Sequence, residues 1–253
     1  MSEILVVKLG GTTLADQAQV LGEVAAVARR RPVVLVHGGG RRITEWLDRL
    51  GVKSRFEGGL RVTDAAALEV AAAVLRGVVN SELVAGLRDL GVDGGLLIAE
   101  RVPGMGLVAH VVGLRRDLID AILVGGQVPV VAPLARDEEG VVCNVNADDV
   151  AAGIAAGLGA RQLVLMTDVD GVRDADGRRL DTLTAAEAET FIDDGVIAGG
   201  MVPKIRAALA ALTWDGAEAV IADGSAAGAL ERAIADPTFG TRLTATRRAV
   251  GAA

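Results

Sequence analysis

The sequence predicts an α/β protein: a three-layer α/β/α sandwich with a largely parallel central sheet, formed by residues 1–253 as a single domain. Short apolar runs rich in β-branched residues recur along the chain, and helical patterns lie between them. These runs are apolar throughout instead of alternating with polar residues. Such strands are typical of parallel sheets that are covered by helices on both faces.

Six apolar runs are predicted to be strands, and four segments are predicted to be helices. In the first helix, Ile43, Trp46, Leu47 and Leu50 follow the i, i+3, i+4, i+7 spacing. Asn146 is the expected N-cap of the third. Turn residues predict hairpins at 137–140 and 174–177. The predicted strands are 5–9, 33–36, 96–98, 128–131, 163–166 and 219–221, and the predicted helices are 41–50, 114–124, 147–158 and 202–212.

Composition excludes several classes of protein. The net charge is −7 and only 2% of residues are aromatic, so neither the basic face nor the stacking platform of a nucleic-acid binder is present. No apolar stretch reaches the roughly 18–20 residues that span a bilayer, and the start of the chain lacks the basic region of a signal peptide. We therefore expect a cytoplasmic protein with a small-molecule ligand. The single cysteine, Cys143, excludes an internal disulfide, and we expect it to be buried as an apolar residue.

A lysine interrupts the first predicted strand. Only three of the 26 basic residues are lysines, namely Lys8, Lys53 and Lys204. An ammonium group among Val and Leu side chains loses its proton or needs an anion, because burying an unpaired charge costs several kcal/mol or more. Lys8 therefore predicts an anionic partner.

Glycine-rich turns follow the first two predicted strands. Gly10 and Gly11 end the first, and residues 38–40 are three glycines that end the second. Backbone N–H groups at such strand-to-helix turns bind anions. Neither turn has the Walker A spacing or the G-x-G-x-x-G spacing, which disfavours a P-loop NTPase and a Rossmann dehydrogenase.

Arg61 is predicted to lie in a loop before a helix, with Thr63 as the N-cap and Asp64 in the first turn. The planar fork of an arginine suits a carboxylate.

Residues 144–149 combine two asparagines with two aspartates. Alternation places Asn144 and Asn146 on one side, and either Asp148 or Asp149 lies near the start of the following helix. Capping explains Asn146 and one of the acids, but it does not explain Asn144.

Together these segments resemble the amino acid kinase family, and within it the acetylglutamate kinases. The motifs occur in the family's order across most of the chain. They are Val-Lys-Leu-Gly-Gly (7–11), Val-His-Gly-Gly-Gly (36–40), Gly-Leu-Arg-Val-Thr (59–63), Asn-Val-Asn-Ala-Asp (144–148), Thr-Asp-Val-Asp-Gly-Val (167–172), Gly-Gly-Met-Val-Pro-Lys (199–204) and Gly-Thr-Arg (240–242).

The resemblance implies ATP-dependent phosphorylation of the side-chain carboxylate of N-acetyl-L-glutamate, which yields N-acetyl-glutamyl 5-phosphate in arginine biosynthesis. It implies Mg²⁺ carried by ATP with no protein ligands, and a homodimer. Because no extra helix is expected before the first strand, we expect no inhibition by arginine.

The resemblance also assigns roles to residues. Lys8 and Lys204 would stabilise the transferring phosphoryl group, and Asp148 would organise both lysines. The implied substrate-binding residues are Gly39, Gly40, Arg61 and Asn144. The implied nucleotide-binding residues are Gly10, Gly11, Asp168, Val169, Asp170, Gly171, Val172, Arg173, Val196, Ile197 and Ala198.

No general base is evident, and this reaction needs none. A glutamate side chain has a pKa of about 4.3 and is already an anion at neutral pH. We accordingly interpret His37 and His110 as structural. One departure from the family pattern is that residues 98–104 lack the Ser-Gly-Lys-Asp-Gly run of many acetylglutamate kinases, so the role of residues 98–113 stays open.

Three alternatives share the expected fold. One is the kinase of lysine biosynthesis that phosphorylates aminoadipate or glutamate on a carrier protein. Another is a carbamate or uridylate kinase. The third is a ligand-sensing domain that has lost catalysis, which would have less need for Lys8, Asp148 and Lys204 together.

Overall fold

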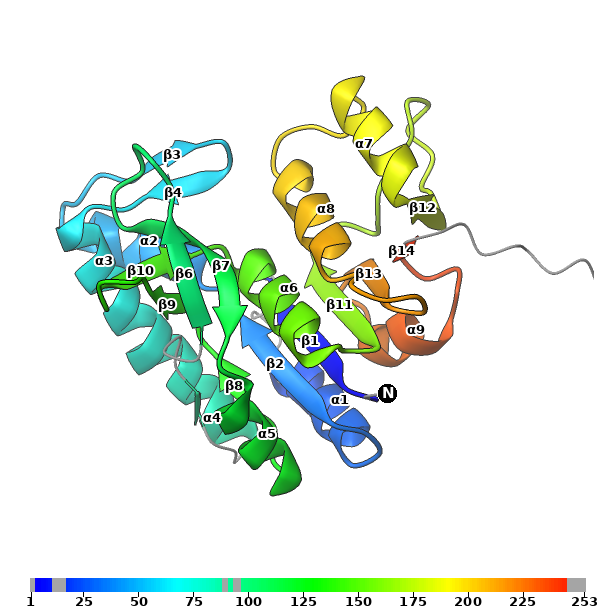
Figure 1. The fold of residues 1–253 in the computed structure, drawn as a ribbon, viewed down its shortest axis with the longest axis horizontal. Helices are drawn as coiled ribbons and strands as arrows, with labels where there is room; N and C mark the ends of the chain where they lie inside the picture. The colour runs from blue at the N-terminus through cyan, green and yellow to red at the C-terminus, as the bar shows by residue number, and fades with distance from the viewer. Residues whose placement is uncertain (1–2, 11–16, 88–90, 93–96, 245–253) are drawn as a thin grey trace, which may run out of the picture.

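A computed structural model describes residues 3–10, 17–87, 91–92 and 97–244, and these residues build one eight-stranded sheet (Figure 1). Six neighbouring strands are parallel. β14 is antiparallel to β13 and parallel to β12. The strand order is β12 (Thr182–Thr184), β14 (Thr241–Thr244), β13 (Glu218–Asp223), β11 (Gln162–Thr167), β1 (Leu5–Leu9), β2 (Val33–His37), β8 (Val130–Val131) and β5 (Gly91–Val92).

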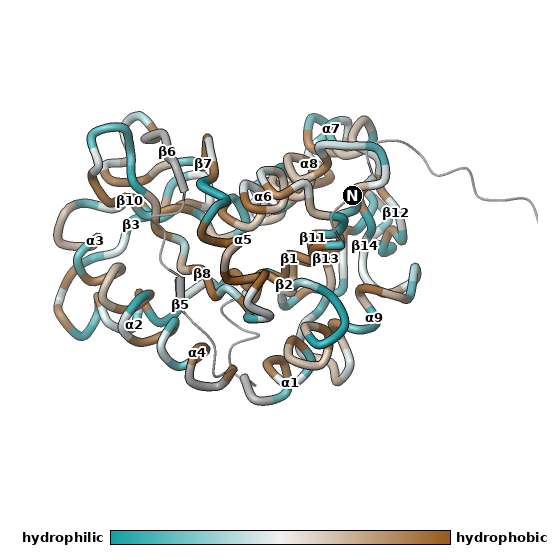
Figure 2. Tube along the Cα trace, turned by 60° about the horizontal axis from the view of Figure 1, so that its bottom comes forward, coloured by the Kyte–Doolittle hydropathy of each residue, from teal (hydrophilic) through white to brown (hydrophobic). Residues whose placement is uncertain are grey.

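Helices cover both faces of this sheet, which confirms the three-layer α/β/α prediction. One buried cluster joins the sheet to α5 (Arg116–Val124), α6 (Ala147–Leu158), α7 (Ala185–Asp193) and α8 (Met201–Ala210). The other joins it to α1 (Gln17–Ala28), α2 (Gly40–Arg49), α3 (Ala65–Ala72), the π-helix η2 (Ala73–Asn80), α4 (Ser81–Leu87) and α9 (Ala229–Ala235). The apolar strands β1 and β2 run through the interior, and polar segments lie outside (Figure 2).

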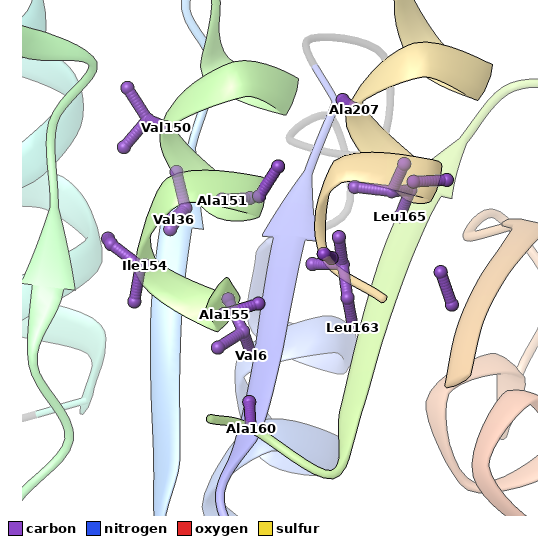
Figure 3. Packing of buried hydrophobic residues seen from close by; sticks show 14 of the residues in the cluster. Val6, Val36, Val150, Ala151, Ile154, Ala155, Ala160, Leu163, Leu165 and Ala207 are labelled. Atoms are coloured by element: carbon purple, nitrogen blue, oxygen red, sulfur yellow. The ribbon is translucent and has the colours of Figure 1, made fainter. Parts of the chain in front are cut away.

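Side-chain alternation on β1 decides which face Lys8 occupies. Leu5, Val7 and Leu9 belong to the cluster under α1, whereas Val6 belongs to the cluster under α6. Figure 3 shows Val6 of β1 packed beneath Ala155 of α6. Successive strand residues point to opposite faces, so Lys8 projects to the α6 side of the sheet.

Helix α6 packs closely against β7 (Val108–Leu114). A Cβ added at Gly153 would lie 2.4 Å from Val111 Cγ1, and one added at Gly157 would lie 2.8 Å from Leu114 Cβ. Asn146 is the N-cap of this helix, and its side chain accepts a hydrogen bond from the Asp148 N–H at 2.8 Å. The predicted N-cap is therefore confirmed. Asp148 is placed in the first helical turn.

Four strands form a small closed barrel beside the main sheet: β6 (Leu97–Arg101), β7, β9 (Leu134–Arg136) and β10 (Val142–Val145). The prediction that residues 96–98 contribute to the parallel sheet is wrong for Leu97 and Ile98, because β6 belongs to the barrel, where it is antiparallel to β7 and parallel to β9. Residue 96 lies outside the described residues. A short apolar run does not specify its partner strand. The hairpin turn predicted at 137–140 joins β9 to β10, and a bridge between Arg173 and Arg179 flanks the one predicted at 174–177.

The segment around Arg61 differs from its prediction. Arg61 lies in β4 (Leu60–Val62), which forms a hairpin with β3 (Arg55–Glu57), and is not in a loop. Thr63 is not the N-cap: its hydroxyl donates to the Arg61 carbonyl at 2.9 Å, and Asp64 caps α3 by accepting from Ala67 N–H at 2.8 Å. Both residue types cap helices, so sequence did not decide between them.

None of the helices within the described ranges combines the length and apolar character needed to cross a bilayer. The single domain over residues 1–253 stays a prediction, and one continuous sheet runs through the described part of the chain.

Candidate active site

Lys8, Asp148 and Lys204 meet in one buried cluster. Lys8 Nζ lies 2.7 Å from Asp148 Oδ1, and Lys204 Nζ donates to Asp148 Oδ2 at 2.8 Å. Each of the three residues is at most 9% exposed. The anionic partner that Lys8 predicts is therefore Asp148, which also binds the second lysine.

Opposing electrostatic effects act on this cluster. Burial raises the pKa of Asp148, but the two ammonium groups outweigh it and lower that pKa to about 2. Burial lowers the pKa of Lys8, and so does the charge of Lys204, whereas Asp148 raises it. Two lysines therefore share the Asp148 carboxylate, and the charge of Asp168 also raises the pKa of Lys8. Such a paired cluster of two amines and one carboxylate can accept a further anion.

Three elements carry these side chains to one point. Lys8 is the fourth residue of β1, Asp148 lies in the first turn of α6, and Lys204 lies in the first turn of α8. The positive end of the α6 dipole favours the Asp148 carboxylate. The carboxyl end of β1 and the amino ends of α6 and α8 thus converge, as is common for binding sites in parallel α/β proteins.

A first cavity of about 220 Å³ opens beside the cluster. It brings together all four predicted substrate-binding residues with Lys8 and Asp148; the four are Gly39, Gly40, Arg61 and Asn144. Its wall also includes apolar side chains, among them Leu75 and Val108. This cavity combines two cationic side chains, Lys8 and Arg61, with apolar wall residues, a lining that suits a small dicarboxylate with an apolar substituent.

The guanidinium of Arg61 is held rigidly on the cavity wall. One nitrogen, Nη2, donates to the Gly40 carbonyl at 3.0 Å and to Thr44 Oγ1 at 2.7 Å, while Nη1 donates to Ser54 Oγ. The ring of Phe56 stacks against it, with the guanidinium carbon 4.6 Å from the ring centroid. These contacts link the β3–β4 hairpin to the glycine turn that starts α2.

Asn144, which capping did not explain, lies in β10 and faces the same cavity. Its Nδ2 donates to Thr63 Oγ1 at 3.4 Å, and its backbone pairs with Val108 of β7. The barrel strands therefore position this amide, and α6 starts three residues later.

A second cavity of about 620 Å³ lies over the C-terminal half of the chain. It is lined by the nine predicted nucleotide-binding residues at 168–173 and 196–198. Sequence reasoning missed Met201 and Asp223, which also line it. Asp223 could have been found, because it ends β13 beside β11, and ligands bind at the carboxyl ends of parallel strands.

The predicted phosphate role of Gly10 and Gly11 stays a prediction. Gly10 N–H donates to the Met166 carbonyl at 3.0 Å, so that amide is engaged by β11 in this conformation. Gly11 lies outside the described residues.

The remaining chemistry-bearing residues have structural surroundings. His37 is fully buried, with Nδ1 2.9 Å from the Gly38 carbonyl, and burial lowers its pKa to about 4. His110 lies 3.3 Å from Asp149 at the surface. Cys143 is buried, as expected.

Comparisons with known proteins agree with this geometry. The profile described as the amino acid kinase family matches residues 3–223. An acetylglutamate kinase from Rubrobacter xylanophilus is 46% identical over 94% of this chain and 95% of its own length, and one from Solibacter usitatus is 43% identical over 94% and 98%. The crystal structure of smu.665 from Streptococcus mutans superimposes with a TM-score of 0.84 at 28% identity, covering 97% of this chain and all of that one. The resemblance inferred from the motifs is thereby confirmed, and this chain belongs to the amino acid kinase family.

Proposed function

We propose that this protein is an ATP-dependent kinase of N-acetyl-L-glutamate, acting in arginine biosynthesis. The observation that carries the proposal is the Lys8–Asp148–Lys204 cluster beside a small cavity that contains Arg61 and Asn144. The acetylglutamate kinases that match most of this chain at 43–46% identity support the same substrate.

In this reaction the side-chain carboxylate of the acceptor attacks the γ-phosphorus of ATP. A new C–O–P linkage forms, the bond from the γ-phosphorus to the β,γ-bridging oxygen breaks, and ADP leaves with the bond electrons. The attacking carboxylate is already ionised at neutral pH, so no proton has to be removed. What the protein must supply is alignment and stabilisation of negative charge.

Lys8 and Lys204 are suited to supply that stabilisation. Asp148 holds both ammonium groups in fixed positions before substrates bind, so little reorganisation is needed when charge develops on the phosphoryl group. Lys8 reaches the cluster from the cavity of the acceptor. Lys204 reaches it from the helix whose first residue, Met201, lines the second cavity.

Arg61 and Asn144 would orient the acceptor. The guanidinium is already fixed by Gly40, Thr44 and Ser54, and it presents a planar cation for the α-carboxylate. Gly39 and Gly40 allow the backbone to approach the ligand closely.

ATP would occupy the second cavity, between residues 168–173 and 196–198. The donor set fits an adenine nucleotide: apolar side chains such as Val169 and Ile197 suit the base, and carboxylates such as Asp168 and Asp170 suit ribose hydroxyls. Mg²⁺ bound to the phosphates would neutralise part of their charge.

We further propose a homodimer in the cytoplasm, where ATP is available. Exposed Trp46 and Leu50 border an apolar groove between α2 and the α3–η2 segment, which gives a dimer a candidate contact face. Size-exclusion chromatography with light scattering tests the dimer. A monomer at micromolar concentration would contradict it.

A coupled ADP-release assay with N-acetylglutamate, glutamate, carbamate and UMP tests the substrate. We expect turnover with N-acetylglutamate and at least tenfold lower kcat/KM with the others. Absence of turnover with N-acetylglutamate would refute the proposal. Turnover only with carbamate or UMP would instead support the carbamate or uridylate kinase, and no turnover with any of the four would favour the lysine-biosynthesis kinase or the sensing domain.

A further inference from the structure

The Gly-Thr-Arg motif at 240–242 is not explained by either cavity. Thr241 is the first residue of β14 and is fully buried, yet its side chain is polar. Its hydroxyl accepts a hydrogen bond from Val172 N–H at 2.8 Å and donates one to the Leu180 carbonyl at 2.6 Å. One buried hydroxyl therefore joins β14 to both sides of a distant hairpin, at Val172 and Leu180.

These bonds close the base of a hairpin. Leu180 N–H donates to the Val172 carbonyl at 2.8 Å, so Val172, Leu180 and Thr241 form a closed ring of three hydrogen bonds. On the N-terminal side of this ring, residues 168–173 line the second cavity. The hydroxyl thus anchors the segment that the nucleotide would contact.

Two glycines allow the close approach that these bonds require. Gly171 has φ +145°, and a Cβ there would lie 2.5 Å from Thr241 Oγ1. Gly240 has φ +84°, and a Cβ there would lie 2.4 Å from the Ile221 carbonyl oxygen. Both positions therefore exclude a side chain in this conformation, and the backbone of the cavity segment can lie directly against the hydroxyl.

We propose that Thr241 is a positioning residue for nucleotide binding. It does not line the second cavity itself; its hydroxyl fixes Val172 and thereby the shape of residues 168–173. This inference rests on the proposed function, because it takes the second cavity to be the ATP site.

Removal of the hydroxyl has a defined cost. In Thr241→Val the side chain keeps its shape, but Val172 N–H and the Leu180 carbonyl lose a partner in a buried place. An unsatisfied buried group weakens the ordered conformation by enough to change an equilibrium about tenfold. The substitution should therefore alter residues 168–173 of the second cavity and leave the first cavity, that of the acceptor, unchanged.

The test compares T241V with T241S, which retains the hydroxyl, and with T213V, a control at an exposed threonine. We expect T241V to raise KM for MgATP, and the calorimetric Kd for MgATP, about tenfold, with KM for N-acetylglutamate changed less than twofold. T241S and T213V should resemble the wild type. Equal MgATP affinity in T241V and wild type would overturn the inference, as would equal increases in both KM values.

Amide hydrogen exchange in the free protein tests the same point before any nucleotide binds. Residues 168–173, including Val172, should exchange faster in T241V than in the wild type and T241S, while residues 38–40 are unchanged. Equal exchange rates at Val172 in T241V and the wild type would overturn the inference. If the rates differ as expected but the wild type does not phosphorylate N-acetylglutamate, the proposed function fails while the role of Thr241 stands.

Discussion

Lys8 and Lys204, 196 positions apart in the sequence, bind opposite oxygens of the same carboxylate, that of Asp148, at 2.7 and 2.8 Å. The carboxylate balances one of the two positive charges. Lys8 lines the acceptor cavity, so a lysine amine lies where a phosphoryl group in transfer would need it.

Asp148→Asn should shift the alkaline limb of the pH–rate profile to lower pH. Burial and the charge of Lys204 lower the pKa of Lys8, and Asp148 opposes this. Without the carboxylate the pKa of Lys8 falls further, so the ammonium is lost at a lower pH. Profiles of kcat/KM from about pH 6 to about pH 10 measure the shift.

The control for that experiment is Asp149→Asn, one residue further along the same helix. Asp149 accepts from Val111 N–H and has no contact with either lysine among the described interactions. An alkaline limb that is the same in D148N, D149N and wild type would contradict the role given to Asp148.

Arg61→Lys should raise KM for N-acetylglutamate about tenfold or more, because a lysine cannot make the contacts with Gly40, Thr44 and Ser54 that fix the cation on the cavity wall. The substrate 4-acetamidobutanoate retains the reacting carboxylate but lacks the α-carboxylate. Its KM should already be high and should change little in R61K. The exposed Arg41→Lys serves as the control. Equal effects of R61K on both substrates would argue against a contact between Arg61 and the α-carboxylate.

His37 should lower the free energy of unfolding as the pH falls below its ordinary pKa. Its folded pKa of about 4 is below the unfolded value of 6.5, so the unfolded state binds the proton first as pH falls. Stability contributed by neutral His37 is complete above about pH 6.5 and decreases toward pH 4 by up to about 3 kcal/mol.

Burial explains the preference for the neutral ring, and the hydrogen bond to the Gly38 carbonyl opposes it. The Gly38 carbonyl accepts from Nδ1, and Asn80 Nδ2 lies 3.2 Å from Nε2. Urea unfolding across this pH window should show a shallower slope in His37→Gln. Asp148 changes the free energy of unfolding only below this pH window, because its pKa is lowered from 3.8 to about 2 on folding. Identical slopes in both proteins would exclude His37 as the source.

Gly153→Ala should destabilise the fold by about 1–3 kcal/mol, because the new methyl group would overlap Val111 in the contact between α6 and β7. Gly22→Ala is the matched control: Gly22 is also helical, but nothing lies within 4 Å of an added Cβ, so alanine should stabilise α1 by up to about 1 kcal/mol. Thermal unfolding compares the two. A higher Tm for G153A than for wild type would show that the helix can move away from β7.

Much of the site could be predicted because strand periodicity and charge are local properties. The lysine in an apolar strand predicted an anionic partner, and alternation along β1 explains why Lys8 faces α6 while its neighbours Val7 and Leu9 face α1. The family resemblance then selected Asp148 over Asp149.

Other features depend on contacts between distant segments. The sequence does not specify that β6 joins a barrel instead of the main sheet, because its apolar residues fit either environment. The hydrogen bond from Val172 to Thr241 joins residues 69 positions apart and exists only because β14 lies at one side of the sheet. Arg61 itself was predicted, but its place in a strand was not. The pairing of β4 with β3 overrides the loop signal of Gly58 and Gly59.

The most direct test of the proposed phosphoryl-transfer centre is kcat for N-acetylglutamate phosphorylation in Lys8→Ala, Lys204→Ala and the double variant, measured by ADP release. The third lysine, Lys53, is exposed, and Lys53→Ala is the control. We predict that each single substitution at the cluster lowers kcat by about 10²–10³, that the double variant is inactive, and that K53A is unaffected. A double variant that retains wild-type kcat would contradict the assignment of Lys8 and Lys204 as catalytic residues.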